Sequence, residues 1–477
     1  MTANDADRRA QPYIEGEWID GADRLSVADL ADGGTYATVE AATSAETERA
    51  VDAAVTASAA MRETTVVERA EWMQEIAAAL EARQEDLAEV IVREAGKPIS
   101  SARSEISSAV ERFRMAAEEG RSHFGEYREG MTGGHEGWQA IVKPQPVGTV
   151  LCIPPYNYPV STAAQQIAPA LVAGNSVVVK PSSHTPVTAA VLTEVIVEAT
   201  DLPEGAFNYV PGRGSEIGDA LTGHEGLDAI AMTGSSGAGE HIARQSGMVE
   251  LHLELGGNAP AIVFPDADLA DAAGACAKGS VKLAGQRCTA VSRVLAHESV
   301  HDDLVERLDL AMESWQPGDL FDESTSVGPL ISEEQAEWVQ ELVEDAVEKG
   351  ADLVRGGDHD GPRYEPTVLS NVPHSARIIH EEQFGPVAAV ASFESEDGAI
   401  EIANESDLAL DSSVFTNDYD RAFRVAEALD TGSVRINGAP SHGIGDIPYG
   451  GNEDSGIGRE GIHSTIEALT TTKSIIL

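Results

Sequence analysis

Cysteine and positive charge are both scarce in this sequence of 477 residues. The three cysteines, Cys152, Cys276 and Cys288, are odd in number and too scattered for a disulfide scaffold or a CxxC metal site, so a reducing cytoplasm is expected. Lysine and arginine number 32 against 80 acidic residues, which gives a formal net charge of −48. Nucleic acid and anionic membrane surfaces attract cationic proteins, so neither is an expected partner.

The sequence also lacks the pattern of a signal peptide and that of a membrane span. Its first residues, MTANDADRRA, do not show a basic stretch followed by an apolar one. Residues 144–179 contain no Asp, Glu, Lys or Arg, but six prolines and several polar Gln, Asn and Ser residues interrupt this interval. Because proline breaks a spanning helix, the interval predicts buried strands and turns.

What the sequence does contain is enough apolar residues, 42%, for a large packed core. At this length we expect two or three domains with a cleft between them. Apolar residues at three- and four-residue spacing predict helices at 44–61, 66–95, 98–120, 301–315, 332–349, 396–405 and 418–430. Short apolar runs alternate with helices at 147–153, 176–180, 259–264 and 292–297. This alternation indicates parallel sheets with crossover helices.

One segment, residues 176–239, is typical of a nucleotide-binding unit. A strand at 176–180, a helix at 187–199 and a strand at 207–210 form a predicted βαβ unit. The glycine-rich stretch GRGSEIGD at 212–219 follows, and then AIAMTGSSGAG at 229–239 leads into a helix expected to begin near Glu240. Main-chain N–H groups and the helix dipole at such a turn can hold a pyrophosphate.

Seven motifs occur in an order that points to one protein family. They are PYNYP (155–159), VVVKP (177–181), MTGSSGAG (232–239), LELGGNAP (253–260), GQRCTA (285–290), EEQFGP (381–386) and IPYGGNEDSGIGREG (447–461). In these motifs the sequence resembles the aldehyde dehydrogenases over almost its whole length. The resemblance implies an α/β fold made of a Rossmann-type parallel-sheet cofactor domain, an α/β catalytic domain and a β oligomerisation arm. The expected ranges are 1–122 and 147–256 for the cofactor domain, 257–452 for the catalytic domain, and 123–146 and 463–477 for the arm. The resemblance also implies a homodimer or homotetramer.

Three residues in these motifs are the candidate catalytic groups. Cys288 lies in a polar turn beside Arg287, whose positive charge is expected to favour the thiolate that attacks an aldehyde. The resulting alkoxide needs hydrogen-bond donors, which the resemblance assigns to the amide of Asn157 and the main-chain N–H of Cys288. Glu254 resembles the base that activates water to cleave the thioester. Cys152, in a strand, and Cys276, in a helix, are expected to be small buried hydrophobes.

The resemblance also implies a nicotinamide dinucleotide as the cofactor. Lys180, at the end of an apolar strand, matches a contact to the adenosine ribose. Three residues further on, many NAD-using relatives have a glutamate. Here Ser183 leaves room for a 2′-phosphate, so NADP is favoured over NAD. The other residues at cofactor-binding positions are Pro155, Gly212, Gly234, Ser235, Gly239, Leu255, Glu382 and Phe384.

Within that family the sequence is most similar to the non-phosphorylating glyceraldehyde-3-phosphate dehydrogenases. Arg112, Tyr158 and Arg287 match positions that hold the substrate phosphate there. The fourth position, normally arginine, is His442, whose neutral imidazole offers one donor in place of a charged fork. The expected reaction is oxidation of glyceraldehyde 3-phosphate to 3-phosphoglycerate without ATP formation. Lactaldehyde and succinate semialdehyde are the alternative substrates.

Two other classes of function stay open. A non-catalytic binding or structural protein could share this fold, although the joint presence of Cys288, Glu254 and Asn157 favours an enzyme. An acyl-phosphate reductase also uses a thiol but needs no water-activating glutamate, so Glu254 distinguishes the two. The histidines include no HExxH pair, and His241 and His252 are expected to be surface or hydrogen-bonded core residues. No metal is therefore expected.

The excess of acidic residues predicts adaptation to high salt, because concentrated salt screens closely spaced surface carboxylates. We expect dialysis into low salt to abolish activity, measured as formation of reduced nicotinamide. Full activity at about 0.1 M ionic strength would instead identify an ordinary acidic cytosolic protein.

Overall fold

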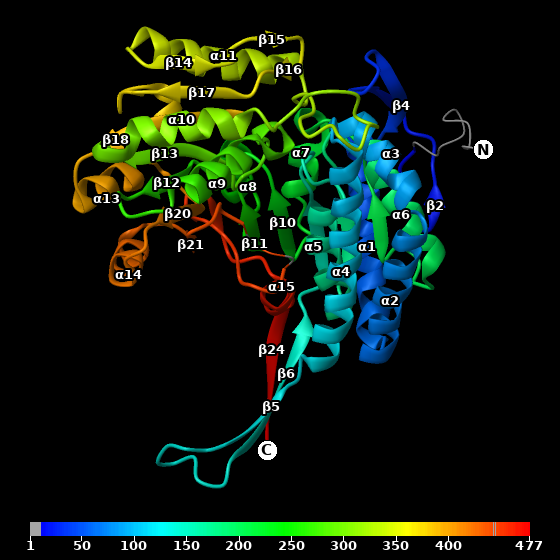
Figure 1. Cartoon of the computed structure of the whole chain (residues 1–477). Helices are drawn as coiled ribbons and strands as arrows, with labels where there is room; N and C mark the ends of the chain where they lie inside the picture. The colour runs from blue at the N-terminus through cyan, green and yellow to red at the C-terminus, as the bar shows by residue number, and fades with distance from the viewer. Residues whose placement is uncertain (1–10, 442, 444) are drawn as a thin grey trace.

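A computed structural model describes residues 11–441, 443 and 445–477 of the chain. It contains two large sheets, each covered by helices, and a thin arm that projects away from both (Figure 1). The two sheets are formed by different parts of the chain, so their facing edges come together only in the folded molecule.

The first sheet has eight strands in the order β2-β1-β9-β8-β7-β10-β11-β23. They are β1 (Tyr13–Ile14), β2 (Glu17–Trp18), β7 (Thr149–Ile153), β8 (Ser176–Val179), β9 (Phe207–Tyr209), β10 (Ala229–Thr233), β11 (Glu250–Glu254) and β23 (Gly456–Ile457). The five strands from β9 to β11 run parallel. In β8, Val177 and Val179 belong to one apolar core and Val178 to another, because successive strand residues point to opposite faces. Helices therefore cover both faces of this sheet, as the alternation of strands and helices predicted.

The helices around this sheet depart from the sequence prediction in two places. They are α1 (Ser44–Glu63), α2 (Val66–Ala82), α3 (Gln84–Ala95), α4 (Ile99–Ser122), α5 (Ser161–Ala173), α6 (Pro186–Ala199), α7 (Gly214–Thr222) and α8 (Ser236–Gln245). The prediction of a single helix at 66–95 was wrong, since Arg83 has a non-helical backbone and separates α2 from α3. The start near Glu240 was also wrong. Helix α8 begins at Ser236 because the side chain of Ser235 caps it by accepting the N–H of Ala238.

The second sheet has seven strands in the order β14-β17-β18-β13-β12-β20-β21. They are β12 (Ala259–Val263), β13 (Val291–His297), β14 (Asp352–Arg355), β17 (Thr367–Ser370), β18 (Val387–Phe393), β20 (Asp411–Phe415) and β21 (Ser433–Ile436). All neighbours pair in parallel except β14, which closes one edge antiparallel to β17. The helices of this part are α9 (Leu269–Val281), α10 (His301–Met312), α11 (Glu333–Glu348), α12 (Arg377–His380), α13 (Glu396–Asn404) and α14 (Tyr419–Ala428).

The arm is a three-stranded antiparallel sheet in the order β24-β6-β5 (Figure 1). It consists of β5 (Glu126–Glu129), β6 (Gln139–Pro146) and β24 (Thr470–Ile476), the last of which follows α15 (Ile462–Ala468). Several large apolar side chains on it are exposed, namely Tyr127, Trp138, Ile141, Ile475 and Ile476. Exposed apolar patches mark interaction surfaces, so the predicted role in subunit contact stays a prediction. The remaining strands form the pairs β3 (Asp23–Ala28) with β4 (Thr35–Ala41), β15 (His359–Asp360) with β16 (Arg363–Tyr364), and β19 (Leu408–Ala409) with β22 (Asn452–Glu453).

Cys152 and Cys276 are fully buried, as predicted. Cys152 lies in β7 and Cys276 in α9. Burial raises the pKa of Cys276 to about 12, and it raises the pKa of Cys152 further, so both thiols are neutral and inert. Of the helices in the described ranges, none combines the length and apolar character that a membrane crossing requires.

Arg293 ties the second sheet to helix α13. Its guanidinium is completely buried and donates to the carbonyl oxygens of Asn258, Ile402 and Ala403 at 2.9–3.0 Å. Two of these carbonyls lie near the C-terminal end of α13, where the helix dipole favours a cation. Burial lowers the pKa of Arg293 to about 10, which leaves it charged at neutral pH.

We expect Arg293→Met to destabilise the protein, because three buried carbonyl oxygens lose their donors. The loss should be at least about 3 kcal/mol, and the Tm should fall by roughly 3 °C or more in differential scanning calorimetry. The matched control is Arg114→Met, which removes a more exposed guanidinium paired with Glu81 and Glu111. If both variants melt at the same temperature, the contacts of Arg293 do not stabilise the fold as described.

Candidate active site

Two cavities meet at Cys288. The smaller, of about 270 Å³, is lined by four basic residues, Lys97, Arg112, Lys282 and Arg287, and we call it the basic cavity. The larger, of about 500 Å³, lies against the ends of β7, β10 and β11 and is called here the large cavity. Tyr158, Thr162 and Cys288 line both. A group held in either cavity therefore has access to the same sulfur atom.

The turn that presents Cys288 is tightly constrained. It follows a 3₁₀ segment, Lys282–Gly285, in which Leu283 and Ala284 both have a positive φ. A side chain on Gly285 would lie 2.0 Å from the carbonyl oxygen of Gly385, and one on Gly257 would lie 2.2 Å from that of Cys288. Close backbone approach on both sides thus fixes the position of the cysteine.

The predicted effect of Arg287 on the Cys288 thiol is outweighed in the structure. Arg287 does lower the pKa of Cys288, but burial and the carboxyl groups of Glu254 and Glu382 raise it more. The net result is a pKa of about 12. The predicted direction of the Arg287 effect is thus confirmed, but desolvation and the nearby acids outweigh one guanidinium, so the thiol keeps its proton. A base must take the proton when the thiol reacts.

Asn157 is held in position by a hydrogen bond that leaves one of its N–H groups free. Its Nδ2 donates to the carbonyl oxygen of Gln286 at 2.8 Å, immediately before the turn of Cys288. Gln286 is itself anchored, since its Oε1 accepts the N–H of Ile331 at 2.9 Å. An amide nitrogen carries two hydrogens, so the second can donate to an oxygen bound near Cys288.

Glu254, at the end of β11, is a buried carboxyl group beside Cys288. Both of its carboxyl oxygens are buried without a hydrogen-bond partner. Burial and the charge of Glu460 raise the pKa of Glu254 well above its usual value, although Arg459 opposes this. A raised pKa brings Glu254 closer to the pKa of the thiol, which makes proton transfer between them easier.

The sequence analysis missed Glu460, and its prediction for His252 was wrong. Glu460 lines the large cavity, accepts a hydrogen bond from Thr233, and has its pKa raised to about 7 by burial. Glu460 lies in the motif at 447–461, so the sequence offered it as a candidate site residue. The sequence did not show that its side chain is buried. His252 is buried, but neither of its ring nitrogens has a hydrogen-bond partner. The prediction of a surface or hydrogen-bonded core residue was therefore wrong. His241 is exposed and contacts Asp219, as expected of a surface residue.

The large cavity collects most of the predicted cofactor residues, and it suits a dinucleotide. Six of them line it, namely Pro155, Gly234, Ser235, Leu255, Glu382 and Phe384. Glu382 accepts the N–H of Gly257 at 3.0 Å, and a side chain on Gly256 would lie 2.9 Å from its other oxygen. Bare backbone at Gly234 and Gly256, together with the N-terminus of α8, provides room and donors for a pyrophosphate.

The other four cofactor residues lie outside this lining. They are Lys180, Ser183, Gly212 and Gly239, although both neighbours of Ser183, Ser182 and His184, line the cavity. Lys180 follows β8 and donates to the carbonyl oxygen of Pro181 at 3.0 Å. Burial lowers its pKa to about 8. Sequence reasoning missed further lining residues, among them Tyr156, near the end of β7, and Gln335 and Trp338 on α11.

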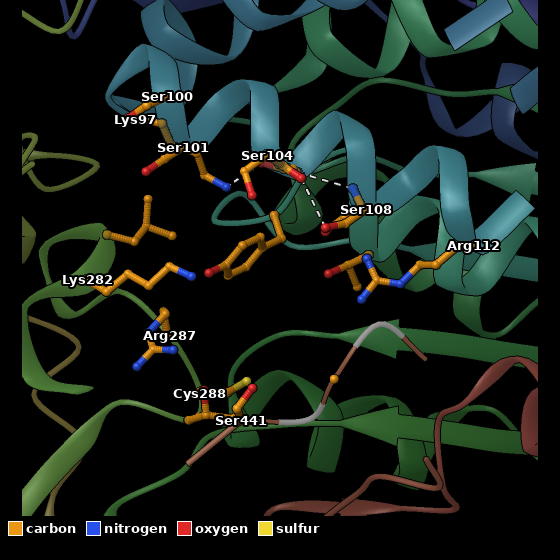
Figure 2. A pocket seen from close by; sticks show the side chains of 17 residues that line it. Lys97, Ser100, Ser101, Ser104, Ser108, Arg112, Lys282, Arg287, Cys288 and Ser441 are labelled. Carbon is orange, nitrogen blue, oxygen red and sulfur yellow. Dashed lines mark hydrogen bonds and ion pairs between the residues drawn. The ribbon is translucent and has the colours of Figure 1, made fainter. Parts of the chain in front are cut away.

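The basic cavity brings together Arg112, Tyr158 and Arg287, whereas His442 lies outside the described residues (Figure 2). Arg112 Nε donates to Gln165 at 2.8 Å, and its buried Nη1 has no hydrogen-bond partner. Arg287 Nη2 donates to the carbonyl oxygen of Gly279 at 2.9 Å, and its buried Nε has none. Both guanidinium groups line the cavity, so their positive charge favours an anion bound there.

Two further basic residues of this cavity, Lys97 and Lys282, were missed in the sequence. Lys97 forms a buried ion pair with Glu105, and its ammonium lies 3.9 Å from the centre of the Tyr158 ring. Serine side chains of α4 line the same wall, at Ser100, Ser101, Ser104 and Ser108 (Figure 2). Their spacing of three and four residues places Ser101, Ser104 and Ser108 on one helix face, which was the available signal.

Comparison with known proteins agrees with this geometry. Residues 18–475 match the model of the aldehyde dehydrogenase family. The chain is 38% identical over 466 residues to the NADP-dependent glyceraldehyde-3-phosphate dehydrogenase of Streptococcus equinus, covering 97% of this chain and 98% of that protein. It is 36% identical to the 3-sulfolactaldehyde dehydrogenase of Priestia aryabhattai, covering 98% and 97%.

Among solved structures, the NADP-dependent glyceraldehyde-3-phosphate dehydrogenase of Bacillus halodurans C-125, complexed with NADP, superimposes with a TM-score of 0.96. It is 36% identical, and the match covers 98% of this chain and 99% of that one. The family match spans both cavities and the cysteine between them, so the chain belongs to the aldehyde dehydrogenase family.

Proposed function

We propose that this enzyme oxidises an aldehyde that carries a terminal anionic group, with glyceraldehyde 3-phosphate as substrate, 3-phosphoglycerate as product and NADP as cofactor. The observation that carries the proposal is the set of basic side chains, Lys97, Arg112, Lys282 and Arg287, that line the cavity ending at Cys288. Relatives named for phosphorylated and sulfonated aldehydes support the anionic character of the substrate.

The chain's own residues account for attack on the aldehyde. As the sulfur of Cys288 bonds to the carbonyl carbon, the deprotonated form of Glu254 takes the thiol proton. The oxygen becomes an alkoxide, which accepts hydrogen bonds from the free N–H of Asn157 and the main-chain N–H of Cys288. Because Glu254 must lose its proton first, the rate of this step rises with pH through the raised pKa of Glu254.

Ser235 and Glu382 would hold a nicotinamide dinucleotide in the large cavity, and that group would supply the acceptor for the hydride that leaves the carbonyl carbon. Loss of the hydride would leave the acyl group on Cys288 as a thioester. Glu254 releases the thiol proton to solvent and then takes a proton from the water that attacks the thioester; the carbon–sulfur bond breaks, the carboxylate leaves, and Glu254 returns the proton to the sulfur. The buried position of Glu254 and its lack of hydrogen-bond partners leave both oxygens available for this water.

We expect glyceraldehyde 3-phosphate to have the highest kcat/KM in a panel that includes succinate semialdehyde, lactaldehyde and propionaldehyde at high salt. Each charge-assisted contact to the anion contributes about 1.5–3 kcal/mol, so one such contact alone should raise kcat/KM over propionaldehyde by roughly tenfold to a hundredfold. If lactaldehyde or propionaldehyde is used as well as the phosphorylated substrate, the phosphate assignment is wrong.

The control for this panel is Cys288→Ala, which should be inactive with every aldehyde. Mass spectrometry of the wild-type enzyme, quenched during turnover, should show the acyl group on Cys288. Undiminished turnover by Cys288→Ala would contradict the whole scheme.

The cofactor preference rests on Ser183 and Lys180. A hydroxyl at 183 leaves space for a 2′-phosphate, and the Lys180 ammonium is the nearby cation. We expect kcat/KM to be higher with NADP than with NAD. Ser183→Glu should lower kcat/KM for NADP at least about tenfold, because a carboxylate repels the phosphate, and it should leave NAD nearly unaffected. A hundredfold preference of the wild-type enzyme for NAD would overturn this assignment.

A further inference from the structure

Lys282 occupies an unusual place at the wall of the basic cavity. It is the C-cap of α9 and the first residue of the segment that leads to Cys288. The two residues after it, Leu283 and Ala284, are buried and have left-handed backbones, although neither is glycine. Such conformations are costly for residues with a side chain, and they persist where the surroundings fix a functional geometry. The strained turn holds Lys282 and the nucleophile in a fixed relation.

Lys282 differs from the other three cations of the cavity in its charged surroundings. Lys97 is paired with Glu105. Arg112 has the carboxyl groups of Glu460 and Glu105 near it, and the charge of Arg287 acts on that of Asp411. Each of these cations therefore already faces an acid of the chain.

The charges that act on Lys282 are instead all positive, namely those of Arg287, Lys278 and Lys97. Within the described ranges its ammonium has neither a hydrogen bond nor an ion pair. In a chain with 80 acidic residues against 32 basic ones, this arrangement leaves the positive charge of Lys282 uncompensated. Lys282 is exposed where it lines the cavity, and partial desolvation and the neighbouring cations lower its pKa to about 8.

The positions of these groups suit an anion that enters the cavity above Cys288. Figure 2 shows Lys282 and Arg287 on one side of the cavity and Arg112 on the other, with the serines of α4 along the upper wall. Cations and hydroxyl groups are the donors that acceptor-only oxygens require. A phosphate monoester carries close to two negative charges and three such oxygens, whereas a carboxylate or a sulfonate carries one charge.

We propose that Lys282 is a specificity-determining residue that binds the anionic end of the substrate and selects a doubly charged phosphate over a singly charged carboxylate. The inference rests on the proposed function, since it concerns the same cavity. It adds that the second positive charge needed by a dianion comes from the end of α9, in addition to the guanidinium of Arg287.

The test compares Lys282→Met and Lys282→Arg with Lys278→Met, which removes a charge of the same kind one turn earlier on α9, outside the lining of the cavity. For Lys282→Met we expect KM for glyceraldehyde 3-phosphate to rise roughly tenfold to a hundredfold, with kcat changed less than about threefold. KM for succinate semialdehyde should rise by about threefold or less. Lys282→Arg should restore most of the binding, and Lys278→Met should resemble the wild-type enzyme.

Turnover of propionaldehyde reports whether Lys282→Met is folded, because this substrate has no anion to bind. If Lys282→Met loses kcat/KM equally for all three aldehydes, or keeps the wild-type KM for glyceraldehyde 3-phosphate, the proposal is overturned. An equal effect of Lys278→Met would also overturn it, since the effect would then come from the general field of α9.

A second measurement separates this proposal from the choice of substrate. Inorganic phosphate is used as a competitive inhibitor against propionaldehyde at constant salt. Its inhibition constant should rise about tenfold in Lys282→Met, and an unchanged constant contradicts a role of Lys282 in phosphate binding. The proposed function, in contrast, fails on the wild-type substrate panel alone, whatever the variants do.

Discussion

The position of the Cys288 thiol among three carboxyl groups and one guanidinium is the constraint on which the site depends. Desolvation, Glu254, Glu382 and Glu460 all oppose the thiolate, and Arg287 favours it. The resting nucleophile is therefore neutral, and its reactivity depends on a base that is buried with it. Glu254 meets this need because the same burial raises its own pKa. Burial in the same site raises the pKa of both groups, so the proton affinity of the base is brought closer to that of the thiol.

The electrostatic contrast between surface and cavity is the second organising feature. The chain carries a formal charge of −48, yet Lys97, Arg112, Lys282 and Arg287 line one cavity. An acidic surface repels anions at long range, and salt screens this repulsion over about 8–10 Å at moderate ionic strength. The cavity acts at contact distance, where its donors are buried and screening is weak. An acidic exterior and a cavity lined by basic side chains are thus compatible in one chain.

The sequence predicted which residues gather at the site better than it predicted the electrostatics of the site. Cys288, Glu254 and Asn157 stand in contiguous motifs, and the structure brings all three to one place because each motif follows a strand or a turn at the same sheet edges. The pKa of Cys288 was not predictable from its neighbour Arg287, since Glu254 and Glu382 approach it only after folding. Lys282 was missed because a lysine near the end of a predicted helix is normally a solvated charge, and the sequence does not show which cavity it lines. The break at Arg83 was also missed, because apolar periodicity continues across it from α2 into α3.

The short strained segment between α9 and Cys288 links catalysis to substrate choice. Leu283 and Ala284 hold left-handed conformations, and Gly285 is pressed against Gly385, so this segment has no freedom to adjust. The backbone of Lys282 at its start and that of the Arg287–Cys288 pair at its end therefore keep a fixed relation. The guanidinium of Arg287 is also held by the carbonyl oxygen of Gly279, so the cations beside the sulfur limit the distance between the anion of a bound aldehyde and its reacting carbon. Aldehydes whose anion lies at another distance from the carbonyl lose either the contact with the cation or the approach to the sulfur, and this geometric requirement discriminates even among substrates of equal charge.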